Sequence, residues 1–569
     1  MSREHGGCSG GTLGNGQSLQ GMQCSGSVWK LKRKSGEIRM MELLQPQKRT
    51  SAKRVAWFFR ERWVLLPILA LAALVRFYDM TGPAIWYDEA ASVLMSEFSL
   101  PLIWSHTTYD VHPPLYYLLL HGWTAAFGNG VFALRTMSVL AGGVTVGLGV
   151  WLVRLIATRR AAVLAGLLLA LLPIAVRYSQ EVRMYALQGA WLMGATIALI
   201  YWIKHPQQHR YLVVYTLLMT AGLYTHYFAG LCVVSHWLYL LLLRFQPSRT
   251  CHLITRPAWW IANAAVVVLY LPWVPHLINQ LSLTGEVGWI PPVTVFSVPS
   301  IIWESLTLND GRGLPWPIFI ALPVWVLLAS GWSVLRDKGT YKLHALLAIY
   351  TFVPIGVVFL ISFKHSFFVP RYFMFAVIGL PLMLAIALDR LAHRYRTLAI
   401  VCLSVLVSGE GVGLYNVYTQ TNKLNDTVNQ PNNQIDRTTD YINQHFATGD
   451  RIVVNDIYWY LSVAYYNKTG TNPLLYTPPL STGESGRPGE QAEGALLYQD
   501  ADALYVDNLG SLPSETKRVW VVQGSEPDEA MTVPKNWLPV SALTTGDTQV
   551  WLYAVCTTAV CGPLRAASN

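Results

Sequence analysis

Long apolar segments recur along most of the chain and limit what it can fold into more than any other feature. A helix needs about 20 apolar residues to cross a lipid bilayer. Hydrophobic residues make up 53% of the chain and charged residues only 13%, a balance that excludes an ordinary soluble protein. The candidate spans lie near 63–80, 132–153, 161–176, 186–203, 211–224, 228–243, 258–275, 315–334, 343–362, 372–388 and 397–415. The sequence therefore predicts an all-α polytopic membrane protein with about 11 transmembrane helices.

The positive charges between these segments predict how the chain crosses the membrane. Residues 1–62 form an arm with 12 Lys/Arg against four Glu, and alternate connections between the spans are also basic. Cytoplasmic connections carry an excess of Lys and Arg, so we expect the N-terminus in the cytoplasm. We expect the arm to be partly disordered and to contact anionic membrane lipids and not nucleic acid. The basic connections contain Arg154, Arg159, Arg160, Lys204, Arg210, Arg244, Arg249, Arg256, Arg336, Lys338, Lys342, Arg390, Arg394 and Arg396.

The chain becomes polar after the last apolar segment, which divides it into an arm (1–62), a membrane domain (63–416) and a final domain (417–569). In the final domain, "RTTDYINQHFATGDRIVVNDIYWYLSVAYY" predicts a helix, a Gly-Asp turn and an apolar strand, and "KRVWVVQG" predicts a second strand. The charge alternation places this small α/β domain on the extracytoplasmic side. Cys556 and Cys561 are spaced for a small disulfide loop there.

The predicted topology gathers polar residues on the extracytoplasmic face. The adjacent carboxylates Asp88 and Glu89 follow the first span directly. Ionisable residues beside apolar spans are functional candidates by default. The other members of this set are His106, Asp110, His112, Arg177, Glu181, Arg183, Tyr185, His226, Lys364, His365, Arg371 and Tyr372.

Each of these residues also has a structural interpretation. Asp is a favoured N-cap, so Asp88 could cap a helix that begins at Glu89. Arg371 could extend to lipid headgroups, as arginines at helix ends commonly do. His106, Asp110 and His112 form only a weak metal-ligand pattern. These structural interpretations do not explain why so many ionisable residues share one face of the membrane.

The chemistry of this set suggests transfer of a group from a lipid phosphate. A carboxylate can take a proton from a hydroxyl nucleophile as a general base. Arginine close to the membrane plane matches a phosphate or pyrophosphate, bidentately or as a point charge. Two carboxylates could alternatively hold a divalent cation, and the sequence leaves metal dependence open.

Several blocks resemble bacterial integral-membrane glycosyltransferases of the C superfamily, in particular the protein-mannosyltransferase-like group with the aminoarabinose transferases and the rhizobial lipopolysaccharide sugar transferases. These blocks are "WYDEA", "DVHPPLYYLLLHGWTAAFGNGVFALRTMSVLAGG", "YSQEVRMYAL", "LYTHYF" and "FVPRYFMFAVIGLPL", and they span roughly residues 60–390. The resemblance implies a multi-pass protein of the bacterial inner membrane that uses a polyprenyl-phosphate-linked sugar as donor. It implies an active site on the extracytoplasmic face and leaves the sugar and the acceptor (glycan, lipid or protein) open.

The resemblance also implies roles for matching residues. Asp88 becomes the expected catalytic base, with Glu89 as its neighbour and Glu181 as the second acidic residue of the site. We expect Arg371, Arg183 and Tyr372 at the donor phosphate, and His112, His226 and Asp110 as substrate or metal contacts. An alternative function is a lipid-linked-sugar transporter or flippase, which should show inverted repeats and polar residues at the midplane of several spans.

Overall fold

The computed structural model describes residues 65–246, 252–281, 290–421, 433–480, 482–489, 494, 496–497, 501–526 and 531–556, and the backbone of 23–24, 27–34 and 37–42. The chain forms two units, Met1–Val64 and Leu65–Asn569. The first unit contains an antiparallel sheet of β1 (Gln23–Cys24), β2 (Ser27–Lys34) and β3 (Glu37–Glu42). The sequence also predicts that the basic arm is partly disordered. The rest of that arm lies outside the described residues.

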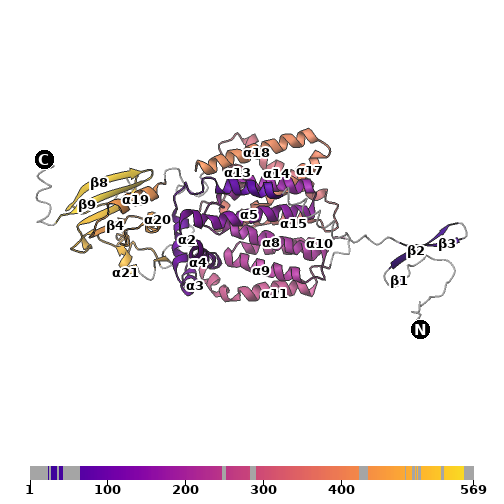
Figure 1. Cartoon of the computed structure of the whole chain (residues 1–569), viewed down its shortest axis with the longest axis horizontal. Helices are drawn as coiled ribbons and strands as arrows, with labels where there is room; N and C mark the ends of the chain where they lie inside the picture. The colour runs from indigo at the N-terminus through magenta and orange to yellow at the C-terminus, as the bar shows by residue number, and fades with distance from the viewer. Residues whose placement is uncertain are drawn as a thin grey trace, which may run out of the picture. The chain divides into compact units, whose positions relative to one another are not determined.

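The second unit contains a bundle of apolar helices (Figure 1). Each of the predicted apolar segments is helical over most of its length. Among the described residues, seven helices are long and apolar enough to cross a membrane, and Leu65–Phe77 and Ala229–Arg244 are shorter apolar helices. The multi-pass membrane fold is therefore confirmed, whereas the count of about eleven spans stays a prediction.

The bundle helices pack around the segment Pro370–Ala392, whose most apolar stretch is 94% buried. This segment comprises the turn η3 (Pro370–Phe373) and helices α16 (Met374–Val377) and α17 (Gly379–Ala392). The helices that pack against it are α5 (Val131–Ile156), α6 (Arg159–Leu171), α8 (Tyr185–Lys204), α14 (Trp316–Leu335), α15 (Leu343–Ile361) and α18 (Arg396–Tyr418). The bundle also contains α7 (Pro173–Arg177), α9 (Arg210–Thr225), α10 (Ala229–Arg244) and α11 (Pro257–Tyr270).

A buried arginine supports the break between α6 and α7. Pro173 opens α7 and has no N–H, so it cannot donate to the carbonyl four residues earlier, that of Leu169. Arg76 reaches this position from the helix Leu65–Phe77 and donates to the carbonyls of Ala170 (2.8 Å) and Leu169 (3.4 Å). The same guanidinium donates to the hydroxyl of Ser179 at 3.2 Å. Arg76 thereby connects the first helix to the turn before α8.

The loops predicted on the extracytoplasmic face contain further helices. The first loop folds into α2 (Tyr87–Glu97), α3 (Leu100–Thr107) and α4 (Leu115–Phe127). After α11, the same apolar segment continues through the turn η1 (Leu271–Trp273) and α12 (Val274–Leu281), and the loop that follows it contains α13 (Ser297–Thr307). Helix α2 begins at Tyr87 with Trp86 as its N-cap, and no side chain caps it. The interpretation of Asp88 as an N-cap is therefore wrong, because Asp88 lies within the first turn and its carboxylate is bound elsewhere.

The final domain is built on a six-stranded mixed sheet of order β6-β5-β4-β7-β9-β8. Strands β4, β5, β6 and β7 pair in parallel, and β9 pairs antiparallel with both β7 and β8. The elements are α19 (Ile435–His445), β4 (Asp450–Val454), α20 (Ile457–Tyr466), β5 (Leu474–Tyr476), α21 (Ala501–Leu504), β6 (Tyr505–Val506), η7 (Leu509–Ser511), β7 (Arg518–Gly524), β8 (Trp537–Thr545) and β9 (Thr548–Val555).

The predicted helix, turn and second strand of this domain correspond to α19, the bend before β4, and β7. The predicted first strand is wrong in its length, since it ends at Val454 and the aromatic stretch after it forms α20. The side chain of Asp456 caps α20 by accepting from the N–H of Tyr458 at 2.7 Å. Cys556 is disulfide-bonded, and Cys561 lies outside the described residues.

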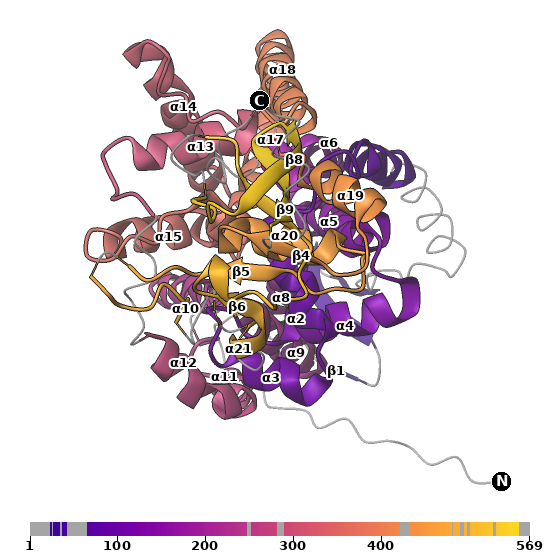
Figure 2. The ribbon, with the colours of Figure 1, turned by 90° about the vertical axis from the view of Figure 1, so that its left-hand side faces the viewer.

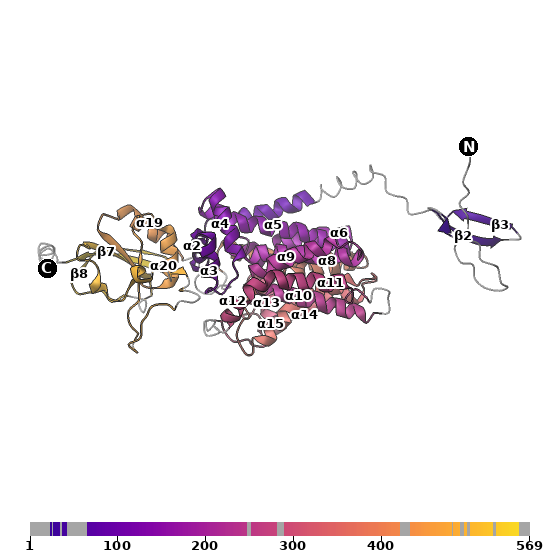
Figure 3. The same cartoon turned by 90° about the horizontal axis from the view of Figure 1, so that it is seen from below.

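Helix α20 lies against α2 at the end of the bundle (Figures 2 and 3). The rings of Tyr87 and Tyr458 are 4.7 Å apart between centroids. The final domain therefore meets the membrane domain at the helix that carries Asp88 and Glu89.

Candidate active site

Polar side chains from distant segments converge at the end of the bundle that carries α2, α3 and α4. Asp88 lies in the first turn of α2, and Glu181 and Arg183 lie immediately before α8. His226 separates α9 from α10, and Arg371 lies in η3. The helices alternate in direction, so these positions share one end of the bundle, as the sequence predicted.

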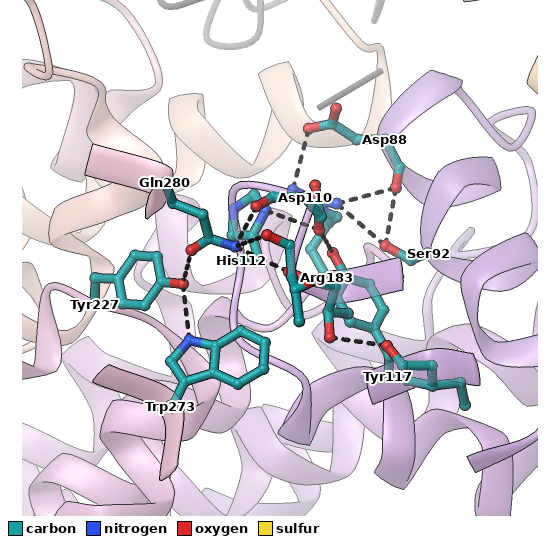
Figure 4. Close-up of polar contacts among 12 residues, drawn as sticks. Asp88, Ser92, Asp110, His112, Tyr117, Arg183, Tyr227, Trp273 and Gln280 are labelled. Carbon is teal, nitrogen blue, oxygen red and sulfur yellow. Dashed lines mark hydrogen bonds and ion pairs between the residues drawn. The ribbon is translucent and has the colours of Figure 1, made fainter. Parts of the chain in front are cut away.

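Asp88 is held between two arginines. Its Oδ2 accepts from Nη1 of Arg371 at 3.2 Å and lies 3.7 Å from Nη2 of Arg183. Arg183 also donates to the backbone oxygen of Asp88 (3.2 Å) and to the hydroxyl of Ser92 (3.1 Å) (Figure 4). The side chain of Asp88 is 17% exposed. Burial alone would raise the pKa of this carboxyl, but Arg183 and Arg371 outweigh burial and hold the pKa below its usual value.

Glu89 points the other way and is fully buried. Its two oxygens accept from Arg135, Oε1 from Nε at 2.9 Å and Oε2 from Nη2 at 2.6 Å, and Oε1 also accepts from the N–H of Val182. Arg135 uses its remaining donors on the carbonyls of Met80, Pro83 and Ala84. This network ties α2, α5 and the turn before α8 together and leaves Glu89 no surface for a substrate.

Glu181 is also almost fully buried, 1% exposed. Its Oε1 lies 2.8 Å from Nη2 of Arg177, one helical turn earlier. Burial raises the pKa of the Glu181 carboxyl, and the charge of Arg177 only partly opposes this. Of the three predicted catalytic carboxylates, Asp88, Glu89 and Glu181, Asp88 is therefore the one that is partly exposed.

Aromatic rings surround the arginine next to Asp88. The guanidinium of Arg371 lies 6.0 Å from the ring centroid of Trp86 and 5.8 Å from that of Tyr372. The ring of Tyr372 lies 5.5 Å from that of His226. Such faces favour a nearby cation, which helps to keep Arg371 charged in an apolar setting.

Asp110 and His112 form a second polar group beside the first (Figure 4). His112 Nδ1 lies 3.8 Å from Asp110 Oδ2, which accepts from the hydroxyl of Tyr117 at 2.9 Å. Burial lowers the pKa of His112, and Asp110 only partly opposes this. The ring of His112 lies 5.7 Å from that of His226, whose pKa burial lowers well below its usual value. We therefore expect both imidazoles to be neutral near pH 7.

Sequence reasoning missed the residues that hold this loop. The amide of Gln280 in α12 donates to the carbonyls of Thr107 (2.9 Å), Thr108 (3.3 Å) and Asp110 (2.5 Å). Tyr227 donates to Gln280, and Trp273 donates to Tyr227 at 3.0 Å. Single neutral polar residues at the end of an apolar segment carry no sequence signal for this role, since only the fold brings these segments together.

Other predicted candidates lie apart from this centre. His106 stacks on Phe98 with centroids 4.2 Å apart, and Lys364 and His365 are exposed. Among the described residues, no cluster of three or more His, Cys, Asp or Glu side chains has the geometry of a metal site. Asp110 and His112 thus remain candidates for substrate contact.

Two buried donors beside Asp88 have no acceptor among the described residues: Nε1 of Trp86 and Nε of Arg183. A buried N–H without an acceptor costs about 1–3 kcal/mol, so such groups mark a place where a polar ligand would be favoured. Two arginines, these donors and the partly exposed carboxylate of Asp88 form a polar group suited to an anion next to a hydroxyl group.

Comparisons with known proteins agree with this fold. Residues 111–276 match the family model described as dolichyl-phosphate-mannose-protein mannosyltransferase. The structure is similar to that of ArnT from Cupriavidus metallidurans in the apo state, with a TM-score of 0.56 and 16% identity over 87% of this chain and 98% of that chain. It is also similar to the same protein bound to undecaprenyl phosphate, with a TM-score of 0.54 and 15% identity over the same shares of the two chains. No curated protein gives a significant match. At these identities the structural similarity establishes the fold.

Proposed function

We propose, from the premise that this chain is a membrane glycosyltransferase of the C superfamily, that it transfers a sugar from a polyprenyl-phosphate-linked donor to a hydroxyl group of a cell-envelope acceptor. The superfamily and the enzyme class are those that the sequence predicted. No comparison supports the transporter or flippase alternative. The reaction is assigned to the extracytoplasmic face of a bacterial inner membrane, with the N-terminus in the cytoplasm.

The observation that carries the proposal is the position of Asp88 between Arg371 and Arg183. In the proposed step, the bond between the sugar C1 and the phosphate oxygen breaks while the acceptor oxygen bonds to C1. The acceptor proton passes to the carboxylate of Asp88, and polyprenyl phosphate leaves with its charge stabilised by the arginines. Fixed positive charge at a departing phosphate is a large source of catalysis, and the leaving group needs no proton.

The two arginines couple donor binding to the strength of the base. In the free enzyme, they lower the pKa of Asp88 and so make it a weak base. A donor phosphate attracts the same guanidinium groups and brings negative charge close to the carboxylate. Both effects raise the pKa of Asp88, so the carboxylate becomes a stronger base only when the donor is bound.

The other predicted residues support this centre. We assign Glu89 and Glu181 to positioning, because both are buried and paired with Arg135 and Arg177. Tyr372 orients Arg371, with which it makes a cation–π contact. His112, with Asp110 behind it, and His226 line the neighbouring surface and are proposed to contact the sugar or the acceptor. The ArnT structure with undecaprenyl phosphate supports a polyprenyl phosphate as the lipid carrier.

The test is transfer of labelled sugar from a panel of polyprenyl-phosphate sugars by the full chain in proteoliposomes. Envelope glycans, lipids and proteins serve as acceptors. Asp88→Asn keeps the shape of the side chain and removes the base, so transfer should fall by about a hundredfold or more, the scale of lost general-base catalysis. Glu97→Gln, at the exposed far end of the same helix, is the control and should keep wild-type transfer.

Full activity of Asp88→Asn would overturn the assignment of the base. Wild-type protein that moves lipid-linked sugar across the same vesicles, without transfer from any donor in the panel, would instead favour the transporter.

A further inference from the structure

We infer that the final domain is a structural part of the active site, and that Tyr466 is a positioning residue for Asp88. This inference deepens the proposed function, since it concerns what holds the proposed base in place. It rests on contacts between α20 of the final domain and the chain segment that leads into α2.

The segment before α2 has backbone groups that need partners from elsewhere. Ile85 is fully buried, and it precedes the N-cap Trp86, which has no side-chain cap. The N–H of Ile85 donates to the hydroxyl of Tyr466 at 2.8 Å, across 381 positions of the sequence. A buried N–H that loses its partner costs about 1–3 kcal/mol. The hydroxyl of Tyr466 therefore stabilises this segment in its observed path.

The opposite side of the same segment is fixed by the membrane domain. Arg135 donates to the carbonyls of Met80, Pro83 and Ala84 and is itself bound by Glu89. The segment is thus held through its carbonyls by α5 and through an N–H by α20. Neither domain alone supplies both sets of bonds.

Asp88 lies three residues after Ile85, in the first turn of α2. Its carboxylate reaches Arg371 at 3.2 Å and Arg183 at 3.7 Å, so a shift of the helix start by about 1 Å would change both contacts. A misplacement of that size can cost about a hundredfold in rate. Tyr466 is not one of the proposed substrate contacts and would act through Ile85 and α2.

The neighbouring tyrosine provides a matched control. Tyr465 also donates a hydrogen bond from α20 to the membrane domain, to the carbonyl of Asn129 at 2.8 Å in the loop between α4 and α5. That loop does not carry Asp88. Tyr465→Phe and Tyr466→Phe each remove one hydroxyl from the same helix, so they separate general loosening of the domain contact from loss of the bond to Ile85.

The experiment measures hydrogen–deuterium exchange over residues 83–92 and steady-state transfer for wild type, Tyr466→Phe and Tyr465→Phe, using the full chain. Tyr466→Phe should increase exchange of this segment and lower kcat per folded molecule at least tenfold, with the donor KM within twofold of wild type. Tyr465→Phe should leave both readouts within twofold. Fluorinated tyrosine at 466 keeps a hydroxyl that accepts more weakly and should give intermediate values.

Unchanged exchange in Tyr466→Phe, or increased exchange with unchanged kcat, would overturn the inference. A lower melting temperature with unchanged kcat would give Tyr466 a stabilising role only and would also overturn it. The exchange measurement needs no turnover, so absence of wild-type transfer would count against the proposed function alone. If Tyr466→Phe does not fold, the protein with fluorinated tyrosine at 466 tests the inference instead, by exchange over residues 83–92 and by kcat.

Discussion

Arg371 donates a hydrogen bond to the carboxylate of Asp88 at 3.2 Å, although 283 positions of the sequence separate them. Asp88 lies in the loop after the first apolar helix, and Arg371 lies at the start of the most buried segment of the bundle. Each residue stabilises the charge of the other in an apolar setting. A donor phosphate that binds Arg371 must compete with Asp88, so this one contact links substrate binding to the proposed base.

Arg371→Gln should shift the acidic limb of the rate–pH profile to higher pH. The charge of Arg371 lowers the pKa of Asp88, so its removal lets the carboxyl take up a proton at a higher pH. Activity that needs the carboxylate is then lost sooner as the solution is acidified. The measurement is kcat/KM as a function of pH for wild type and variant, and an acidic limb at or below the wild-type position would contradict this prediction.

The same variant should bind polyprenyl phosphate more weakly. Removing one partner of a buried charged contact costs about 2 kcal/mol or more, which is roughly a 30-fold increase in Kd. Arg394→Gln is the control, because Arg394 is an exposed arginine just beyond the opposite end of α17. The Kd of each variant is measured by titrating polyprenyl phosphate into the protein in detergent. An equal loss of affinity in Arg371→Gln and Arg394→Gln would indicate that arginines attract the lipid non-specifically.

Glu89→Gln should destabilise the fold more than it impairs the chemistry. The substitution leaves Arg135 as a buried charge without its carboxylate, and breaking such a pair costs about 3–5 kcal/mol. We expect a clearly lower melting temperature, with kcat per folded molecule reduced far less than in Asp88→Asn. Loss of activity as large as in Asp88→Asn, at an unchanged melting temperature, would make Glu89 a catalytic residue.

Much of the membrane fold could be predicted because continuous apolar segments have few alternatives to helices in a membrane. The alternation of these helices also predicted that Asp88, Glu181, Arg183 and Arg371 would share one end of the bundle. Helix α20 was not predictable in the same way, since "IYWYLSVAYY" is rich in residues that favour strands. Its cap at Asp456 and its place between parallel strands β4 and β5 override that preference.

The pairing of residues within the site could not be predicted, because it depends on side chains inside segments that looked purely apolar. Arg135 and Arg76 both lie within predicted spans, where one charge among many apolar residues does not change the prediction. Their carbonyl partners are backbone atoms and leave no trace in the sequence. A buried arginine in a span is itself a signal, however, since its charge and donors must be satisfied inside the protein.

Arg76→Met should lower stability because it leaves the carbonyls of Leu169 and Ala170 without their donors at the break before Pro173. Each orphaned buried carbonyl costs about 1–3 kcal/mol. Arg76→Lys keeps a charge and donors without the planar fork, so it should lose less stability than Arg76→Met. Thermal unfolding in detergent ranks the three proteins. A melting temperature of Arg76→Met equal to that of wild type would show that these bonds are dispensable.

Glu304 in α13 should make stability fall as pH rises. Burial, with a smaller contribution from the charge of Asp310 and against the opposing charge of Arg312, raises the pKa of its carboxyl to about 8. The folded protein therefore keeps a proton on Glu304 between its ordinary pKa of 4.5 and about 8, where the unfolded chain has released it. When a group binds more protons in the folded than in the unfolded state, the free energy of unfolding of the protein falls with rising pH. For one proton this fall is at most about 1.4 kcal/mol per pH unit.

Glu304→Gln removes this titration while it keeps the size of the side chain. The melting temperature of wild type should drop from pH 5 to pH 8.5 by more than that of the variant, and the variant should be the more stable of the two at pH 8.5. Asp310→Asn should give an intermediate result. Loss of the Asp310 charge lowers the pKa of Glu304, so the fall in melting temperature from pH 5 to pH 8.5 should become smaller without disappearing. Parallel pH profiles of wild type and Glu304→Gln would mean that Glu304 is ionised in the folded protein, with its charge stabilised by groups other than Arg312.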